Sequence, residues 1–220
     1  MSDTYPVTKR NKVRQLRENA MYDRRAVHAI LDAAPTAAVS FIEEGNAVVV
    51  PMLIGRDEET IYLHGARKAR VIRWLEQTDQ ACLNVTLVDG IVFARSAFNS
   101  SMNYRSATVF GKPRLVDDTG EKLHALRVIS EHTMPGRWDE LRAPHDREVK
   151  MTGVIALEIE SASAKVSKGP PEDEDEDYSI PIWAGVLAVE TRCTELETDD
   201  RVLEGVEPSP AVRRLQNRSL

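Results

Sequence analysis

The feature that most constrains the fold of this chain is a series of short runs rich in Val, Ile and Ala, separated by turn-forming residues. The runs at 37–42 and 47–53 are joined by a polar link with a glycine, Gly45, of the kind that closes β-hairpins. Asp89-Gly90 separates two further runs, and both residues tolerate the positive φ of a type I′ turn. The pattern therefore predicts consecutive antiparallel hairpins, because a parallel sheet needs regular strand–helix–strand units.

Helical spacing of apolar residues occurs before, between and after these runs. Three stripes recur at intervals of three and four: Val27, Ile30 and Leu31; Val71, Ile72 and Leu75; Leu123, Leu126 and Ile129. Two more strand-like runs, 153–160 and 162–168, follow the third stripe and read as partners in a hairpin. The sequence predicts an α+β fold, mainly antiparallel β and closer to a barrel than to a doubly wound sheet.

The chain is expected to have three parts. Residues 1–22 form a basic extension with a helical pattern, residues 23–190 the main domain and residues 191–220 a tail. A length of 220 residues with 42% apolar content is enough for a substantial core. The acidic run at 172–177 is predicted to be a solvated loop, because its like charges repel one another.

Composition excludes several classes of function. The formal net charge of −6 argues against binding to nucleic acid or to an anionic membrane, which reward an excess of Lys and Arg. The two cysteines, Cys82 and Cys193, lack the spacing of a zinc site and are expected to be reduced thiols. No apolar run approaches the roughly 20 residues that span a bilayer, and the N-terminus lacks the apolar core of a signal peptide, so we expect a cytoplasmic protein.

One strand-to-helix junction has the composition of an anion-binding site. A short strand leads through a small-residue turn into an amphipathic helix, and the residues at that junction are His64, Gly65, Arg67, Lys68 and Arg70. Such a turn lets backbone N–H groups and a helix N-terminus face a ligand beside basic side chains. The junction predicts a site for a phosphorylated cofactor, although a surface turn with solvated basic residues has the same pattern.

The order of these segments resembles the flavin-binding split-barrel proteins of the pyridoxamine-phosphate-oxidase-like superfamily, and within it most nearly the nitroimidazole-resistance-type flavoproteins. The segments that match are RRAVHAIL, VVVPM, IYLHGARKAR, ARSAFNSSMNYRSATVFGK and SAKVSKGPPEDEDEDYSIPIWAGVL, which span 24–189. The resemblance implies a six-stranded split β-barrel with peripheral helices, occupying residues 23–190.

The resemblance also implies which residues hold the cofactor, FMN. It places Arg67, Lys68 and Arg70 at the FMN phosphate, His64 and Gly65 beside the flavin, Tyr104, Arg105 and Ser106 at the ring edge or phosphate, Lys112 as a further contact, and Trp183 near the cofactor across a dimer interface. The chain departs from the family at Val71, where a second basic residue is common, and at Asn99 and Ser100, where relatives have histidines.

The function that follows from the resemblance is an FMN-dependent oxidoreductase. It would act as a homodimer on a small organic substrate, with NAD(P)H as a candidate electron donor. A bound flavin supplies the redox chemistry, so no catalytic triad or metal cluster is required, and no catalytic residue is assigned. The dinucleotide fingerprint GxGxxG is absent from the sequence. Pyridoxamine phosphate itself is not expected as the substrate.

Three alternatives remain open at this point. Split barrels of this superfamily also hold a deazaflavin coenzyme or haem, and the fold alone does not choose among these cofactors. The residues that could ligate haem are His64, His124 and His132. The third alternative is a protein that binds flavin without turnover, as a sensor, a carrier or an interaction module.

Overall fold

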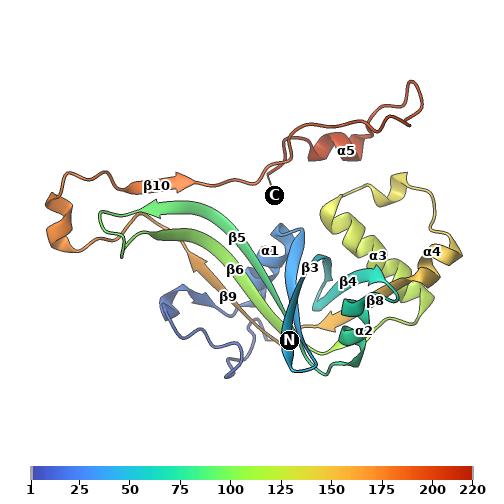
Figure 1. Ribbon diagram of the computed structural model, residues 1–220, viewed down its shortest axis with the longest axis horizontal. Helices are drawn as coiled ribbons and strands as arrows, with labels where there is room; N and C mark the ends of the chain where they lie inside the picture. Colours follow the sequence, from blue (N-terminus) through green and yellow to red (C-terminus); the bar gives the residue numbers. More distant parts are fainter. Residues whose placement is uncertain (1, 220) are drawn as a thin grey trace. The chain divides into compact units, whose positions relative to one another are not determined.

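The computed structural model describes residues 2–219, which form helices and antiparallel strands (Figure 1). These residues divide into two compact units, each assembled from separate stretches of the chain. The first unit comprises residues up to 34, 84–109 and 161–191, and the second comprises 35–83, 110–160 and the residues from 192 onward. None of the described helices is long and apolar enough to cross a membrane.

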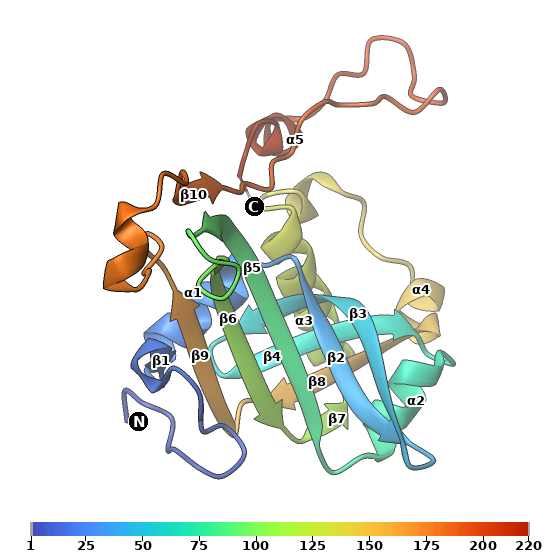
Figure 2. The same cartoon turned by 60° about the vertical axis from the view of Figure 1, so that its left-hand side comes forward.

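The first unit is built around long strands. Its elements are the 3₁₀ turn η1 (Arg17–Asn19), β1 (Ala20–Met21), α1 (Arg24–Ala33), most of β5 (Ala81–Phe93) and of β6 (Ser101–Gly111), β9 (Ser161–Ser167), η3 (Asp175–Ser179) and β10 (Gly185–Ala188). Strand β9 lies between β1 and β6, and β6 is followed by β5. Strand β10 pairs antiparallel with the C-terminal part of β5. Figure 2 shows β5, β6 and β9 side by side.

The second unit contains a meander of strands and most of the helices. Its elements are β2 (Thr36–Glu43), β3 (Asn46–Asp57), β4 (Thr60–Ala66), α2 (Arg70–Gln77), β7 (Pro113–Leu115), α3 (Thr119–Thr133), η2 (Trp138–Glu140), α4 (Asp146–Met151), β8 (Thr152–Glu158) and α5 (Pro210–Leu215). The strands follow the order β2-β3-β4-β8-β7, and each neighbouring pair is antiparallel. The predicted α+β class, mainly antiparallel, is confirmed. The described residues form ten strands rather than six, and seven of them are at least seven residues long.

The β2–β3 hairpin forms where the sequence predicts it. Glu43 pairs with Asn46, so the loop consists of Glu44 and Gly45. Both have positive φ, 50° and 81°, as a type I′ turn requires. A glutamate adopts this conformation less readily than a glycine, because its Cβ crowds the backbone there. The link is therefore a tight two-residue turn with an acidic side chain at its tip.

Helix α3 packs directly against the sheet of the second unit. Its core contacts form a cluster of Tyr62, Val116, Ala125, Ile129, Val154 and Ala156. The helix begins at Thr119, where the Asp118 carboxylate accepts a hydrogen bond from the Glu121 N–H at 2.8 Å and so caps the first turn. A Cβ on Gly55 of β3 would lie 2.6 Å from the Ile129 Cα. The absence of a side chain at Gly55 therefore allows the helix and strand backbones to approach closely.

The predicted turn at Asp89-Gly90 is wrong. Strand β5 runs through both residues without a break, and neither has a positive φ. Gly90 pairs with Ala188 of β10, and a Cβ on Gly90 would lie 2.9 Å from the Val186 side chain. Asp89 accepts two hydrogen bonds from Arg105. Both residues therefore make contacts within the sheet. Their partners lie elsewhere in the sequence, so the Asp-Gly pair alone does not indicate these contacts.

Two other local predictions are also wrong. Strands β8 and β9 are consecutive, but β8 pairs with β4 and β7, and β9 pairs with β1 and neighbours β6. The described part of the N-terminal extension contains no α-helix before Arg24. The Asn11 side chain, almost fully buried, accepts from the Thr8 N–H and donates to the Ala162 carbonyl, and such side-chain bonds compete with helix formation.

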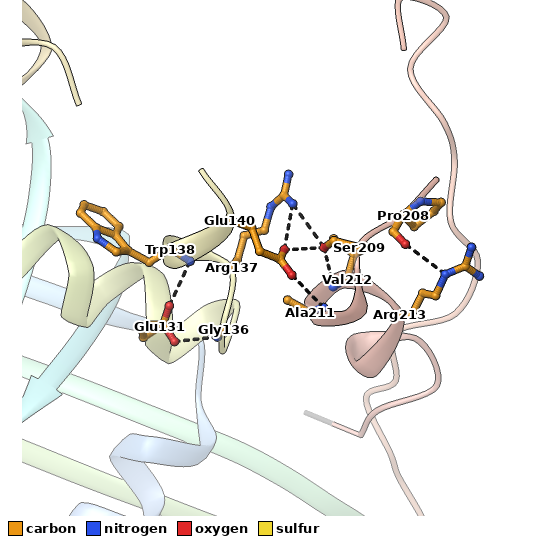
Figure 3. A network of polar contacts seen from close by, with 10 residues as sticks. All are labelled: Glu131, Gly136, Arg137, Trp138, Glu140, Pro208, Ser209, Ala211, Val212 and Arg213. Atoms are coloured by element: carbon orange, nitrogen blue, oxygen red, sulfur yellow. Dashed lines mark hydrogen bonds and ion pairs between the residues drawn. The ribbon is translucent and has the colours of Figure 1, made fainter. Parts of the chain in front are cut away.

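Within the second unit, the start of α5 in the C-terminal segment contacts η2 and the residue before it (Figure 3). The Glu140 carboxylate accepts hydrogen bonds from the Ser209 hydroxyl and from the Ala211 N–H, the latter at 3.3 Å. Arg137 donates to the same carboxylate at 3.1 Å. The hydrogen bond from Ser209 is the main reason that the pKa of Glu140 lies below its usual value. With Ala211 fully buried, these contacts fix the start of α5.

Candidate functional site

Two glycines shape the predicted cofactor-binding junction between β4 and α2. Gly65 pairs with Gly153 of β8. A Cβ on Gly65 would lie 3.3 Å from the Ile72 side chain, and one on Gly153 would lie 2.6 Å from it. Ile72, fully buried, therefore packs into the space above this glycine pair. The glycines bring α2 close to the end of the sheet, which is a packing role beside the ligand-binding role implied for Gly65.

Backbone groups of the junction are partly used within the protein. The Arg67 N–H donates to the Met151 carbonyl at 2.8 Å, and the Ala69 N–H donates to the Ala66 carbonyl at 2.8 Å. Helix α2 begins after Ala69 without a side-chain cap. Two N–H groups of the predicted anion-binding turn therefore already donate hydrogen bonds within the protein. An anion at this turn would be bound mainly by side chains and by the N–H groups in the first turn of α2.

The three basic side chains of the junction have different partners. Arg67 makes a bidentate ion pair with Glu76, with N–O distances of 2.9 and 3.0 Å. Arg70 lies 3.3 Å from the Glu43 carboxylate. Lys68 is exposed and has no carboxylate partner among residues 2–219. The junction therefore holds one unneutralised cation and two arginines that a ligand would have to share with a carboxylate.

His64 is half-buried at the end of β4, where it pairs with Val154. Its Nδ1 atom is buried and has no hydrogen-bond partner within the described chain. Burial lowers the pKa of the His64 imidazole below its usual value, because the charged form loses hydration. At neutral pH the ring is neutral and has a lone pair available for a ligand.

The second predicted group, Tyr104, Arg105 and Ser106, lies on β6 in the first unit, and all three side chains are half-buried. Arg105 donates to both carboxylate oxygens of Asp89 at 2.9 and 2.7 Å. These hydrogen bonds raise the pKa of the Arg105 guanidinium further above its usual value. Arg105 therefore has a carboxylate partner that the sequence analysis did not anticipate.

Trp183 lies in the same unit, in the segment before β10. Its ring is 6.0 Å from the Phe93 ring, centroid to centroid, and its side chain is 71% exposed. A Cβ on Gly185 would lie 2.8 Å from the indole, so the ring folds back over that glycine. An indole this exposed on the surface of the first unit is available to contact a partner protein or a ligand.

Lys112, by contrast, is placed as a surface residue. It follows β6 in the second unit and forms an ion pair with Asp79 at 3.0 Å, in which both side chains are largely exposed. Exposed pairs of this kind contribute little to stability. The contact accounts for Lys112 without a cofactor.

A cluster around Arg95 in the first unit is a feature that the sequence did not predict. The Arg95 N–H and guanidinium donate to the two carboxylate oxygens of Asp173 at 2.8 and 2.9 Å, and the guanidinium lies 4.8 Å from the centre of the Tyr178 ring. Burial alone would raise the pKa of Asp173, but the hydrogen bonds from Arg95 lower it. The Arg95 Nε atom is buried without a partner in the described chain. The acidic run 172–177 is therefore anchored at Asp173 rather than wholly solvated.

The chain belongs to the family of pyridoxamine 5′-phosphate oxidases, whose family model matches residues 23–166. This assignment makes the fold a flavin-binding split barrel, as the sequence analysis predicts. No curated protein matches the chain at a significant level.

Two solved structures match nearly the whole chain. Flavocytochrome Anf3 from Azotobacter vinelandii is 36% identical, with a TM-score of 0.90, and the match covers 96% of this chain and 98% of that one. The FAD and haem binding protein from Mycobacterium smegmatis is 34% identical, with a TM-score of 0.86 and coverage of 90% and 98%.

A third structure supports the predicted subgroup less closely. It is a protein named for 5-nitroimidazole antibiotic resistance, from Bacteroides thetaiotaomicron, with 27% identity, a TM-score of 0.58 and coverage of 67% of this chain and 86% of that one. The two longer matches extend past the nitroimidazole-type resemblance, which ends at residue 189. The match to flavocytochrome Anf3 leaves so few residues uncovered that it includes most of the C-terminal segment that contains α5.

Proposed function

We propose that this chain is a redox protein that binds a flavin and, in the same polypeptide, a haem. The observation that carries the proposal is the near-complete mutual coverage with two proteins whose names state a flavin and a haem. The family alone supports only a flavin-binding fold. Haem enters because the match to flavocytochrome Anf3 covers 96% of this chain and therefore includes segments on both sides of the family region.

The identity of the flavin is the first finer point of the proposal. The resemblance found in the sequence implies FMN, whereas the name of the Mycobacterium smegmatis protein favours FAD. Both carry the same isoalloxazine ring, which accepts a hydride and passes on electrons singly or in pairs when bound. We favour FAD, with Arg67, Lys68 and Arg70 available to its phosphates and the β6 residues Tyr104, Arg105 and Ser106 to polar groups of the cofactor.

His64 is the residue we assign to haem iron. Its buried Nδ1 atom lacks a partner in the described chain, and burial keeps its imidazole neutral, the form that binds metals. The other two histidines considered from the sequence lie on α3: His132 in the last turn, and His124, whose Nε2 is 2.8 Å from the Asp57 carboxylate. Only His64 combines burial with an unused ring nitrogen among the described residues.

A homodimer remains part of the proposal. The family resemblance implies that two subunits enclose the flavin, and the first unit presents apolar side chains that a partner could cover. Ile182, Trp183 and Leu187 are 48%, 71% and 56% exposed, respectively, on and before β10. Apolar groups that lie close together on a surface are typical of interaction sites.

The experiment that tests the haem assignment compares two histidine variants. His64→Ala should reduce the haem content per polypeptide at least about tenfold while flavin remains bound, because it removes the ligand to iron and leaves the phosphate contacts in place. His124→Ala is the matched control and should retain both cofactors, since its ring already pairs with Asp57. Haem and flavin are quantified by absorption after reconstitution and by mass analysis of the released cofactors.

Two results would contradict this assignment. The first is stoichiometric haem in His64→Ala, and the second is loss of haem in His124→Ala with His64 intact. Thermal unfolding of both variants controls for misfolding. Flavin content measured on the same samples separates a failed haem ligand from a failed flavin fold.

A further inference from the structure

Helix α2 has an outward face of which the flavin assignment uses only Arg70. Ile72 and Leu75 are fully buried, so these residues form the core side of the helix. The opposite stripe, at the spacing i, i+3, i+4, i+7, lines a cavity of about 430 Å³ together with the tip of the β2–β3 hairpin. The lining residues are Glu43, Glu44, Arg70, Arg73, Trp74 and Gln77. A cavity of this size is in the range of small-molecule sites.

The charges in this cavity are incompletely paired. Arg70 lies 3.3 Å from the Glu43 carboxylate, which is the ion pair that the cavity contains. Arg73 is exposed, one turn from Arg70, and makes no ion pair with any described residue. Two guanidinium groups on one helix face repel each other unless an anion lies between them. The cavity therefore offers a forked donor set suited to a phosphate group.

Two further residues, Trp74 and Glu44, favour a particular chemical group next to the phosphate in the ligand. Trp74, adjacent to Arg73, presents a half-buried indole to the cavity, and such a ring stacks on planar bases. The strained turn residue Glu44, with φ of 50°, places a carboxylate on the cavity wall that has no ion-pair partner in residues 2–219. A carboxylate accepts hydrogen bonds and therefore favours an exocyclic amino group over a carbonyl oxygen.

We infer that the cavity between α2 and the β2–β3 turn is a binding site for an adenine nucleotide. The phosphate lies on Arg73 and Arg70, the base stacks on Trp74, and the amino group of adenine donates to Glu44. An isoalloxazine ring suits this wall less well, because its single N3–H donor lies between two carbonyl oxygens that Glu44 would repel. The site is separate from the haem proposal, since it requires neither His64 nor iron.

The test measures binding of AMP to the full chain by equilibrium dialysis, with quenching of tryptophan fluorescence as a second readout. Wild-type protein should bind one AMP with a Kd below about 1 mM. Arg73→Ala and Trp74→Leu should each raise the Kd at least about tenfold, because each removes one of the two main contacts. Inorganic phosphate should compete, and more weakly than AMP.

Arg147→Ala is the matched control. Arg147 is an exposed helical arginine on α4, outside the cavity, so its removal should leave the Kd within about twofold. Glu44→Gln should weaken AMP more than it weakens inorganic phosphate, because only AMP has the amino group. No AMP binding at millimolar concentration, or equal binding by wild type, Arg73→Ala and Trp74→Leu, would overturn the site.

The adenine nucleotide could be free or part of FAD, and the same samples distinguish the two sources. Displacement of bound flavin by AMP identifies the adenylate half of FAD as the occupant. Binding of AMP with the flavin retained identifies a free nucleotide, for which NADPH is tested as a competitor. Either result supports the adenine nucleotide site, and AMP binding is scored without reference to the visible spectrum that tests the flavin and haem.

Discussion

Gly111→Ala is expected to destabilise the protein severely, with a loss of about 3 kcal/mol or more in the free energy of unfolding. A Cβ on Gly111, at the end of β6, would lie 2.0 Å from the carbonyl oxygen and 3.0 Å from the carbonyl carbon of Glu158. These are backbone atoms at the end of β8, and they are held by the pairing of β8 with β4, so they cannot rotate away. The melting temperature, measured by circular dichroism, should fall by roughly 6–12 °C.

Gly120→Ala is the matched control for this substitution. Gly120 lies in the first turn of α3, and its Cβ would meet only the Asp118 side chain, at 3.2 Å. Alanine favours the helix over glycine, so the melting temperature should change by less than about 3 °C. Equal effects of the two substitutions would show that the close approach of β6 to the end of β8 is not the cause.

Ile155→Ala should have the second large effect, a loss of about 2–5 kcal/mol in the free energy of unfolding. Ile155 is fully buried on β8, where it pairs with Leu63 on one side and Leu115 on the other. Removing the larger part of its side chain loses apolar burial and leaves a cavity between these strands. Urea unfolding followed by tryptophan fluorescence measures the change.

Ile42→Ala makes the same chemical change at a position of β2 where the side chain is 60% exposed. Its cost should be below about 1 kcal/mol, because little apolar area is lost and no cavity forms. A cost at position 42 as large as that at position 155 would contradict the placement of Ile155 in the core.

The sequence predicted the elements whose signals are local. The β2–β3 turn and the passage from β4 into α2 both depend on residues a few positions apart. The turn predicted at Asp89-Gly90 failed because the reason for that glycine is β10, which pairs with β5 from far along the chain. A glycine required for close packing and a glycine required for a turn are indistinguishable in one sequence.

In the candidate site as well, the sequence predicted local features and missed contacts between residues that are distant in the chain. The sequence identified the basic junction after β4, but the carboxylates that pair with Arg67 and Arg70 belong to α2 and β2, and periodicity alone does not match these charges. The pair of Arg105 with Asp89 was missed because Asp89 was taken for a turn residue. The role of His64 depends on burial of one ring nitrogen, which only coordinates reveal.

Whether one polypeptide holds both a flavin and a haem is measured by an absorption spectrum of the purified protein, followed by mass identification of the cofactors released on denaturation. We expect flavin bands near roughly 375 and 450 nm together with a haem Soret band, and release of FAD and haem from the same preparation. A colourless protein that takes up neither added flavin nor added haem would contradict the account. Release of a deazaflavin coenzyme would contradict the cofactor assignment while leaving the split-barrel family in place.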